Sequence, residues 1–204
     1  GDSLGLGDLD GDGDMDAVVA SRRLDDRALL RLQRPDGSWE VAGLEGVRPR
    51  SYFPAVVVAA SQGSEVTELA LSWVQLSGAA DWRSGIDLYR RAADGWLRSE
   101  VSWRRGAVEI RALAAGDVDG DGRRDLVAGD DRGEIELYVG RADGSLAAER
   151  SSSLARAGGG CGVYAARLAD LDADGRPELI VAFAAEPAPG RCETGGSLQV
   201  WRAR

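Results

Sequence analysis

Five aspartates crowd into one short stretch near the start of the chain, at Asp8, Asp10, Asp12, Asp14 and Asp16. Carboxylates this close repel one another and favour their protonated forms, unless a hard cation sits among them. Calcium suits such a loop, because it takes about six to eight oxygen ligands in flexible geometry and a Gly permits the sharp turn. For one isolated stretch, a solvated acidic turn is the alternative.

The acidic spacing occurs three times, in GDLDGDGDMD at 7–16, GDVDGDGRRD at 116–125 and ADLDADGRPE at 169–178. We number each loop from its first acid, so that acids occupy positions 1, 3, 5 and 9 and a Gly occupies position 6. The acids of the second and third copies are Asp117, Asp119, Asp121 and Asp125, then Asp170, Asp172, Asp174 and Glu178. Three copies with the same offsets argue against chance and against simple solvation.

The segments around the loops have the character of strands. An EF-hand would need flanking helices and a Glu at position 12, but that position holds Val19, Ala128 and Val181. Short apolar runs precede and follow each loop, which predicts a turn between two strands. The metal would then clamp a hairpin through the side chains of positions 1, 3, 5 and 9. The position 7 carbonyl completes the predicted ligand set, at Asp14, Arg123 and Arg176.

A fourth copy of the frame lies at 55–73, with four residues in place of the acids: Ala60, Gln62, Ser64 and Glu68. It predicts the strands without the metal. The first positions, 8, 60, 117 and 170, recur at a period of a little over fifty residues. Asp-Gly turns between alternating runs predict a second hairpin in three of the repeats. Each repeat would therefore be a four-stranded unit with strands a to d.

Four-stranded units at this period predict an all-β β-propeller, here a single domain over 1–204 with four blades. The repeats are about 1–50, 51–106, 107–157 and 158–204. The chain ends in strand c of the fourth repeat, so the last blade is expected to be incomplete. An upstream segment could close the ring, the repeats could be part of a larger propeller, or the last blade could stay three-stranded.

The signature D-x-D-x-D-G-x-x-D at 8–16 and 117–125, with a final Glu at 170–178, resembles the FG-GAP/VCBS-type repeats of the integrin α-subunit propeller and its bacterial relatives. The resemblance spans essentially the whole chain and implies about three Ca²⁺ ions and adhesion-like recognition. The Phe-Gly and Gly-Ala-Pro flanks that name the family are absent.

Composition narrows the function classes. The net charge is −9, and all 25 basic residues are Arg. The chain therefore has no basic footprint for nucleic acid, and no apolar run is long enough to span a membrane. His is absent, which removes the commonest general base, and the acids are assigned to calcium, so we expect no enzyme activity. The absence of Lys, His and Asn suggests a GC-rich bacterial genome.

The two cysteines are expected near each other. Cys161 lies at the start of the fourth strand a, and Cys192 lies in the fourth b-to-c loop, which shares a face with that strand start. A disulfide between them is sterically sensible and would indicate an oxidising compartment, such as the cell exterior, cell surface or periplasm. Two reduced thiols that never meet are the alternative.

The face opposite the metal loops receives the longer connections, at 43–54, 73–85, 102–107 and 186–196. Binding residues concentrate on such loops, and Trp, Tyr and Arg are enriched at interface hot spots. The candidate ligand-binding residues are Arg50, Tyr52, Trp82, Arg83, Trp103, Arg104 and Arg105. Packing between blades for the aromatic residues, and simple solvation for the arginines, is the alternative.

Two functions stay open at this point. The first is a calcium-stabilised, non-enzymatic binding module for a protein or glycan on the face opposite the metal loops. The second is a structural or accessory domain of a larger secreted protein or enzyme, which could associate through its incomplete last blade.

Overall fold

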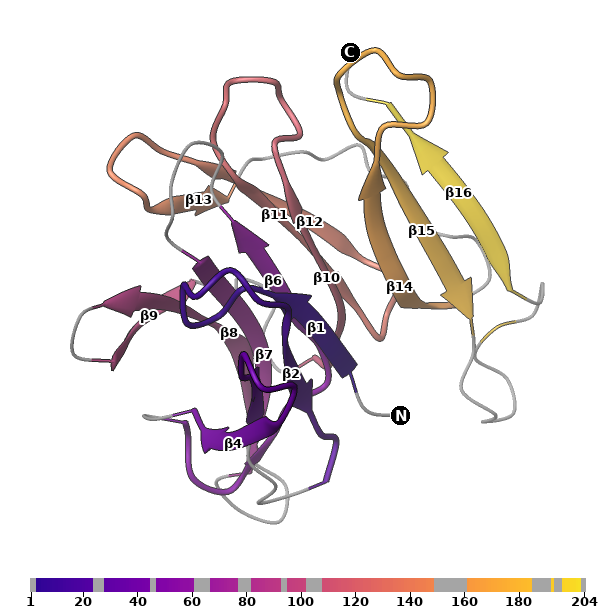
Figure 1. The fold of residues 1–204 in the computed structure, drawn as a ribbon. Helices are drawn as coiled ribbons and strands as arrows, with labels where there is room; N and C mark the ends of the chain where they lie inside the picture. Colours follow the sequence, from indigo (N-terminus) through magenta and orange to yellow (C-terminus); the bar gives the residue numbers. More distant parts are fainter. Residues whose placement is uncertain are drawn as a thin grey trace. The chain divides into compact units, whose positions relative to one another are not determined.

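A computed structural model describes residues 3–23, 28–44, 47–60, 67–76, 82–92, 95–101, 108–148, 161–184, 192 and 196–202. The regular structure in these residues is β-strand throughout, arranged in four antiparallel sheets (Figure 1). Contacts group the chain into unit 1, Gly1–Glu109, and unit 2, Ile110–Arg204. None of the described residues forms a helix long and apolar enough to cross a membrane.

Blade 1 is a four-stranded sheet that follows the order of the chain. Its strands are β1 (Ser3–Gly7), β2 (Asp16–Ala20), β3 (Leu29–Gln33) and β4 (Trp39–Gly43). Buried and half-buried side chains alternate along β2, as expected of a strand with one face in the core. Gly7 pairs with Asp16, so the first acidic loop joins the ends of β1 and β2.

Blade 2 has one strand more than the sequence predicted. Its strands are β5 (Ser51–Tyr52), β6 (Val56–Ala60), β7 (Thr67–Leu76), β8 (Trp82–Ala92) and β9 (Gly95–Val101). The long β7 pairs with β6 over its first half and with the short β5 near its end. Ser72 stabilises the break between the two, because its hydroxyl accepts the Ala55 amide at 2.9 Å.

Blades 3 and 4 form unit 2. The strands of blade 3 are β10 (Ile110–Gly116), β11 (Asp125–Asp130), β12 (Ile135–Gly140) and β13 (Leu146–Ala148). Blade 4 has three strands among the described residues: β14 (Gly162–Ala169), β15 (Glu178–Ala184) and β16 (Ser197–Trp201). They lie side by side in Figure 1, with no partner on the outer edge of β16 in the described part of the chain.

The Asp-Gly turns close the c–d hairpins as predicted. In blade 1 the Gly37 amide donates to the Arg34 carbonyl at 2.7 Å, and Gly37 has a φ of 80°. Gly144 repeats both features in blade 3, with a φ of 78°. Glycine adopts this left-handed conformation without steric cost.

Each unit has its own apolar core. In unit 1 the core gathers large side chains, among them Phe53, Trp73 and Tyr89. A Cβ on Gly85 would lie 2.6 Å from the Trp73 ring, so only Gly lets the indole cross β8. The core of unit 2 is built from smaller residues such as Ala112 and Ala114, together with Cys161, Val181 and Phe183. The all-β fold with four propeller-type blades confirms the predicted fold class.

Candidate metal centres

The carboxylate of position 1 organises each acidic loop. Asp8 accepts the amides of Gly11 at 2.7 Å and Gly13 at 3.0 Å. Asp117 accepts the amides of positions 4, 5 and 6, at 2.7, 3.1 and 2.8 Å. Asp170 accepts those of positions 5 and 6, at 3.1 and 2.9 Å. Backbone amides therefore wrap this acid and curl the loop around it.

The turn needs left-handed backbone at two positions. At position 6 the φ angles of Gly13, Gly122 and Gly175 are 89°, 81° and 88°. At position 4 two loops have Gly, but the third has Ala173 with a φ of 60°. A side chain in this conformation is strained relative to Gly. The blade 4 loop is therefore the least relaxed of the three.

The acid of position 9 is the most deeply placed, with Asp16 and Asp125 fully buried and Glu178 only 3% exposed. One of its oxygens accepts the amide of position 2, at 2.7 Å in blades 1 and 3 and 2.8 Å in blade 4. In blades 1 and 3 the other oxygen accepts an amide at the end of strand c, from Gln33 and Gly140, at 2.8 Å each. Burial raises the pKa of Asp125, and this effect outweighs the hydrogen bonds from the Gly140 and Val118 amides, which lower it.

Positions 1, 3 and 9 converge in every acidic loop. Each offers a carboxylate oxygen, and the oxygens of a group lie within 4.8 Å of one another: Asp8, Asp10 and Asp16; Asp117, Asp119 and Asp125; Asp170, Asp172 and Glu178. In the first group Asp10 Oδ1 is buried without a hydrogen-bond partner. Burial, then the Asp16 and Asp12 charges, raises the pKa of Asp10. An all-oxygen donor set with an unpaired buried oxygen fits a hard cation such as Ca²⁺.

Positions 5 and 7 are engaged with each other in the loop. The position 5 carboxylate accepts the position 7 amide at 2.9 Å in blade 1 and at 2.8 Å in blades 3 and 4. The residues concerned are Asp12, Asp121 and Asp174 at position 5, and Asp14, Arg123 and Arg176 at position 7. Their role as metal ligands stays a prediction.

A model of the FG-GAP-like repeat family matches residues 117–181. That stretch begins at the first acid of the blade 3 loop and ends in β15, so it contains two of the three acidic loops. Blades 3 and 4 therefore contain sequence that is similar to the FG-GAP-like repeat. This agrees with the resemblance seen in the sequence.

No curated protein matches the sequence of this chain. Among solved structures, it is similar to a crystal structure from Bifidobacterium bifidum s17 described as that of a candidate exo-beta-1,3-galactanase. The two share 12% sequence identity, with a TM-score of 0.47, over 98% of this chain and 87% of the other.

Blade 2 shows what the repeat does without a metal loop. Its position 9 acid, Glu68, is retained and is only 6% exposed. Both Nε and Nη2 of Arg90 approach Glu68 Oε1, at 2.7 and 2.6 Å. A guanidinium therefore neutralises this carboxylate from the neighbouring strand β8.

Two of the acidic loops are also contacted by arginines that the sequence pattern did not indicate. Arg34 Nη1 lies 3.0 Å from Asp10 Oδ2 in blade 1. Arg202 lies beside two acids of blade 4, with Nη2 at 3.0 Å from Asp172 and Nε at 3.5 Å from Glu178. Both arginines come directly after strand c, which is β3 in blade 1 and β16 in blade 4.

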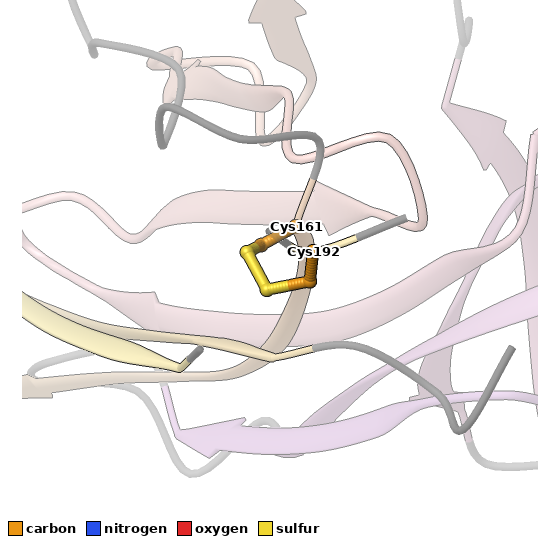
Figure 2. The surroundings of a disulfide bond; sticks show 2 residues. All are labelled: Cys161 and Cys192. Carbon is orange, nitrogen blue, oxygen red and sulfur yellow. A yellow bond between two sulfur atoms is a disulfide. The ribbon is translucent and has the colours of Figure 1, made fainter. Parts of the chain in front are cut away.

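The predicted disulfide is present. Cys161 precedes β14 and is bonded to Cys192, which belongs to the b-to-c connection of blade 4 (Figure 2). The bond closes a sequence separation of 31 residues. Both half-cystines pack with the core of unit 2.

Four of the predicted ligand-binding residues meet at one end of blade 2. Residues 51 and 52 pair with Gln75 and Val74 on one side of β7, and Arg83 and Trp82 pair with Gln75 and Leu76 on the other. The Arg50 carbonyl accepts the Leu76 amide at 3.2 Å. Arg50 and Arg83 are exposed, and Tyr52 and Trp82 are half-buried. Trp103, Arg104 and Arg105 lie outside the described residues.

Proposed function

We propose that this chain is a non-enzymatic, calcium-stabilised binding module that recognises a protein or a glycan outside the cytoplasm. The observation that carries the proposal is the convergence of three carboxylates in each of three loops. These acids would hold Ca²⁺, and the ion would lock the a–b hairpin of its blade.

The charge of the chain supports a cation at each loop. The net charge is −9, and three divalent ions would offset six of those charges. The buried position 9 acid receives neutral backbone amides in blades 1 and 3. Amides stabilise a carboxylate without cancelling its charge, so a cation among the three acids would relieve their mutual repulsion.

The candidate binding surface is the end of blade 2 that carries Arg50, Tyr52, Trp82 and Arg83. These residues come from two separate chain segments, and the β5–β7–β8 pairing brings the segments together. Neighbouring strands lie about 4.8 Å apart, so the patch is about 10 Å across. Tyr52 and Trp82 lie on the same face of the sheet, because Val74 and Leu76, their partners on β7, are two residues apart, whereas Arg83 lies on the other face. Tyr and Trp are enriched at protein hot spots, and their flat rings also suit the faces of sugars.

Metal content and thermal stability test the calcium assignment. The chain purified in Ca²⁺ should contain about three ions, and chelation should lower its melting temperature. At a free concentration of 100 Kd, each ion adds about 2.7 kcal/mol to the free energy of unfolding. Unit 2 has two of the three clusters, so hydrogen exchange should show the larger loss there. An unchanged melting temperature with no bound metal would refute calcium binding.

A glycan array probed with the labelled chain in Ca²⁺ tests recognition. Trp82→Ala should abolish array binding, while Trp39→Ala should leave it intact, because Trp39 is a 51% exposed indole on β4, a strand of a different blade. Equal loss in both variants would count against the blade 2 surface. If the chain binds no glycan on the array, the ligand would be a protein, and crosslinking with the same two variants tests that form of the proposal.

A specific observation favours the accessory-domain alternative. The outer edge of β16 has no partner strand among the described residues, and it carries Leu198 and Val200, which are 69% and 50% exposed. Unpaired apolar edges promote association with another chain. If Leu198→Lys converts a self-associated form to monomer by light scattering, the accessory function is favoured.

The remaining parts of the proposal follow from composition and chemistry. A disulfide persists in oxidising compartments, which supports an extracellular, cell-surface or periplasmic location. The sequence contains no His, and the clustered acids are assigned to the cation. This supports a role in binding rather than catalysis.

A further inference from the structure

The four blades fall into two classes according to the acid at position 9. Blades 1 and 3 have Asp, and its second oxygen accepts a backbone amide from the end of strand c. Blades 2 and 4 have Glu, and an arginine of strand c or just beyond it contacts that carboxylate. Two otherwise different blades therefore use the same side-chain cation.

The arginines of blades 2 and 4 occupy the same place in the repeat. Leu69, which follows Glu68, pairs with Tyr89, and Arg90 comes next. Leu179, which follows Glu178, pairs with Trp201, and Arg202 comes next. The same register puts Leu32 in blade 1 and Val139 in blade 3 at this place. Glu with Arg, and Asp with an apolar residue, are thus two versions of one design.

In blade 2 the arginine has fully taken over the role of a cation. Glu68 is buried, and its carboxylate is paired with Arg90 in a loop frame that lacks the acids of the metal loops. In blade 4 the acids are present and the arginine is present too. Arg202 contacts Asp172 and Glu178, which are two of the three members of that cluster.

We propose that Arg202 is a built-in competitor for the cation of the blade 4 loop, so that Ca²⁺ enters only by displacing its guanidinium. This rests on the proposed calcium binding and ranks the sites within it. The blade 3 cluster fills first, because its acids Asp117, Asp119 and Asp125 form no ion pair among the described residues. Arg123 of the same loop pairs with Asp121, at position 5, which lies outside this cluster. The blade 4 cluster fills last.

The physical basis is reciprocal coupling. The ion and the guanidinium would use the same two carboxylates, Asp172 and Glu178, so the free energy that the Arg202 contacts contribute is lost when the ion binds. The side chain of Arg202 is 66% exposed, so once displaced it is solvated readily. Partly exposed ion pairs are modest, and we expect the competition to weaken calcium binding about three- to tenfold.

The loop glycines report each site separately. The amides of Gly13, Gly122 and Gly175 donate to Asp8, Asp117 and Asp170 at 3.0, 2.8 and 2.9 Å. Their NMR cross-peaks should shift as the adjoining site fills. In a Ca²⁺ titration of the full chain, Gly122 should reach its midpoint before Gly175.

The decisive variant is Arg202→Gln, which should lower the Gly175 midpoint about three- to tenfold and leave the Gly122 midpoint unchanged. Arg202→Lys retains the charge without the planar fork and should give a smaller shift. Arg141→Gln is the matched control, because it removes the same charge from the c–d turn of blade 3, and it should not move Gly175.

Three outcomes overturn the inference. The Gly175 midpoint could be unaffected by Arg202→Gln, or it could move equally in the Arg141→Gln control, which would indicate net charge alone. Gly175 could also fill together with Gly122 in the wild type. If no loop glycine responds to Ca²⁺, the calcium proposal itself fails, and that result is distinct from an unaltered order of filling.

Discussion

The two units reach a folded state by different means. Unit 1 packs large side chains, including Phe53, Trp73 and Tyr89, and has one acidic cluster. Unit 2 has a core with several alanines, but it also has two acidic clusters and the disulfide. Burial of a large side chain stabilises by about 1.5–3 kcal/mol. The comparison teaches that, within one repeat design, a disulfide and two acidic clusters accompany the core that is built from smaller apolar residues.

Unit 1 also contains an ion pair with a buried carboxylate, Asp87. The Arg48 guanidinium binds Asp87 through Nε at 3.1 Å and Nη2 at 3.0 Å. The same group lies 4.0 Å from the centre of the Trp73 ring. Burial and the Asp87 charge raise the pKa of Tyr89, close by, to about 12. Charge is therefore neutralised inside unit 1 by side chains.

Removal of the disulfide should have the largest effect of the variants that test this comparison. The Cys161→Ala, Cys192→Ala double variant loses a bond across 31 residues, which stabilises by about 3–4 kcal/mol in the chain-entropy model. Hydrogen exchange should show the loss in β14 and β15. A loss below about 1 kcal/mol would mean that unit 2 does not depend on its cross-link.

The position 9 acids should respond differently in blades 3 and 2. Asp125→Asn should cost about 1–3 kcal/mol, because an amide cannot accept both the Val118 and the Gly140 amides. Glu68→Gln should cost at most about 1 kcal/mol, because Arg90 is 47% exposed and can turn toward water. Denaturant unfolding in chelator measures both. Equal costs would contradict the distinction between the two blades.

Relief of the backbone strain in the blade 4 loop should change the stability less than the two preceding sets of variants do. Ala173 has a φ of 60°, while the other two loops have Gly at position 4. Ala173→Gly should therefore stabilise unit 2 by about 0.5–1 kcal/mol, measured by thermal unfolding in chelator. Gly120→Ala in blade 3 is the matched reverse change and should destabilise by a similar amount. A destabilising Ala173→Gly would show that the loop is not strained there.

The smallest expected effect concerns pH and the b-to-c turn of blade 3. Asp130 Oδ1 accepts the amides of Arg132 and Glu134, while Oδ2 is buried without a hydrogen-bond partner. Burial raises the pKa of Asp130 above its ordinary value of 3.8. When the pKa of a carboxyl is higher in the folded state than in the unfolded state, its protonated form adds to the free energy of unfolding at pH values below the unfolded-state pKa. That contribution is lost as the pH rises through the folded-state pKa.

The stability of the wild type relative to Asp130→Asn should therefore fall as the pH rises from the ordinary Asp pKa of 3.8 through the raised pKa of the folded state. Denaturant unfolding at several pH values measures the difference. Ser21, at the same position of blade 1, accepts the Arg23 amide without a charge, so blade 1 provides the uncharged reference. A difference that grows with pH would contradict the sign of the pKa shift.

Much of the fold could be predicted because the strands and turns of each repeat are specified by short stretches of sequence. The apolar runs before and after Asp8, Asp117 and Asp170 predicted the strands that pair as β1–β2, β10–β11 and β14–β15. The Asp-Gly turns predicted the c–d hairpins. The extra strand β5 was missed because two residues form too short a run to show alternation.

The cluster geometry was predictable only in part. The recurrence at positions 1, 3 and 9 identified the acids that converge. The spacing could not show that the position 5 carboxylate bonds the position 7 amide. It also could not show which acid is buried, because Asp16 is covered by an amide from Gln33, far along the chain.

The sequence by itself determined the repeat, the strands, the acidic loops and the cysteine pair, because these depend on contacts within one hairpin or one blade. Only the tertiary structure decided which cation approaches each loop. Arg90 and Arg202 reach Glu68 and Glu178 through the register of strand c against strand b. A one-residue change in that register would turn each arginine to the other face of its sheet, and no local pattern in the sequence specifies it.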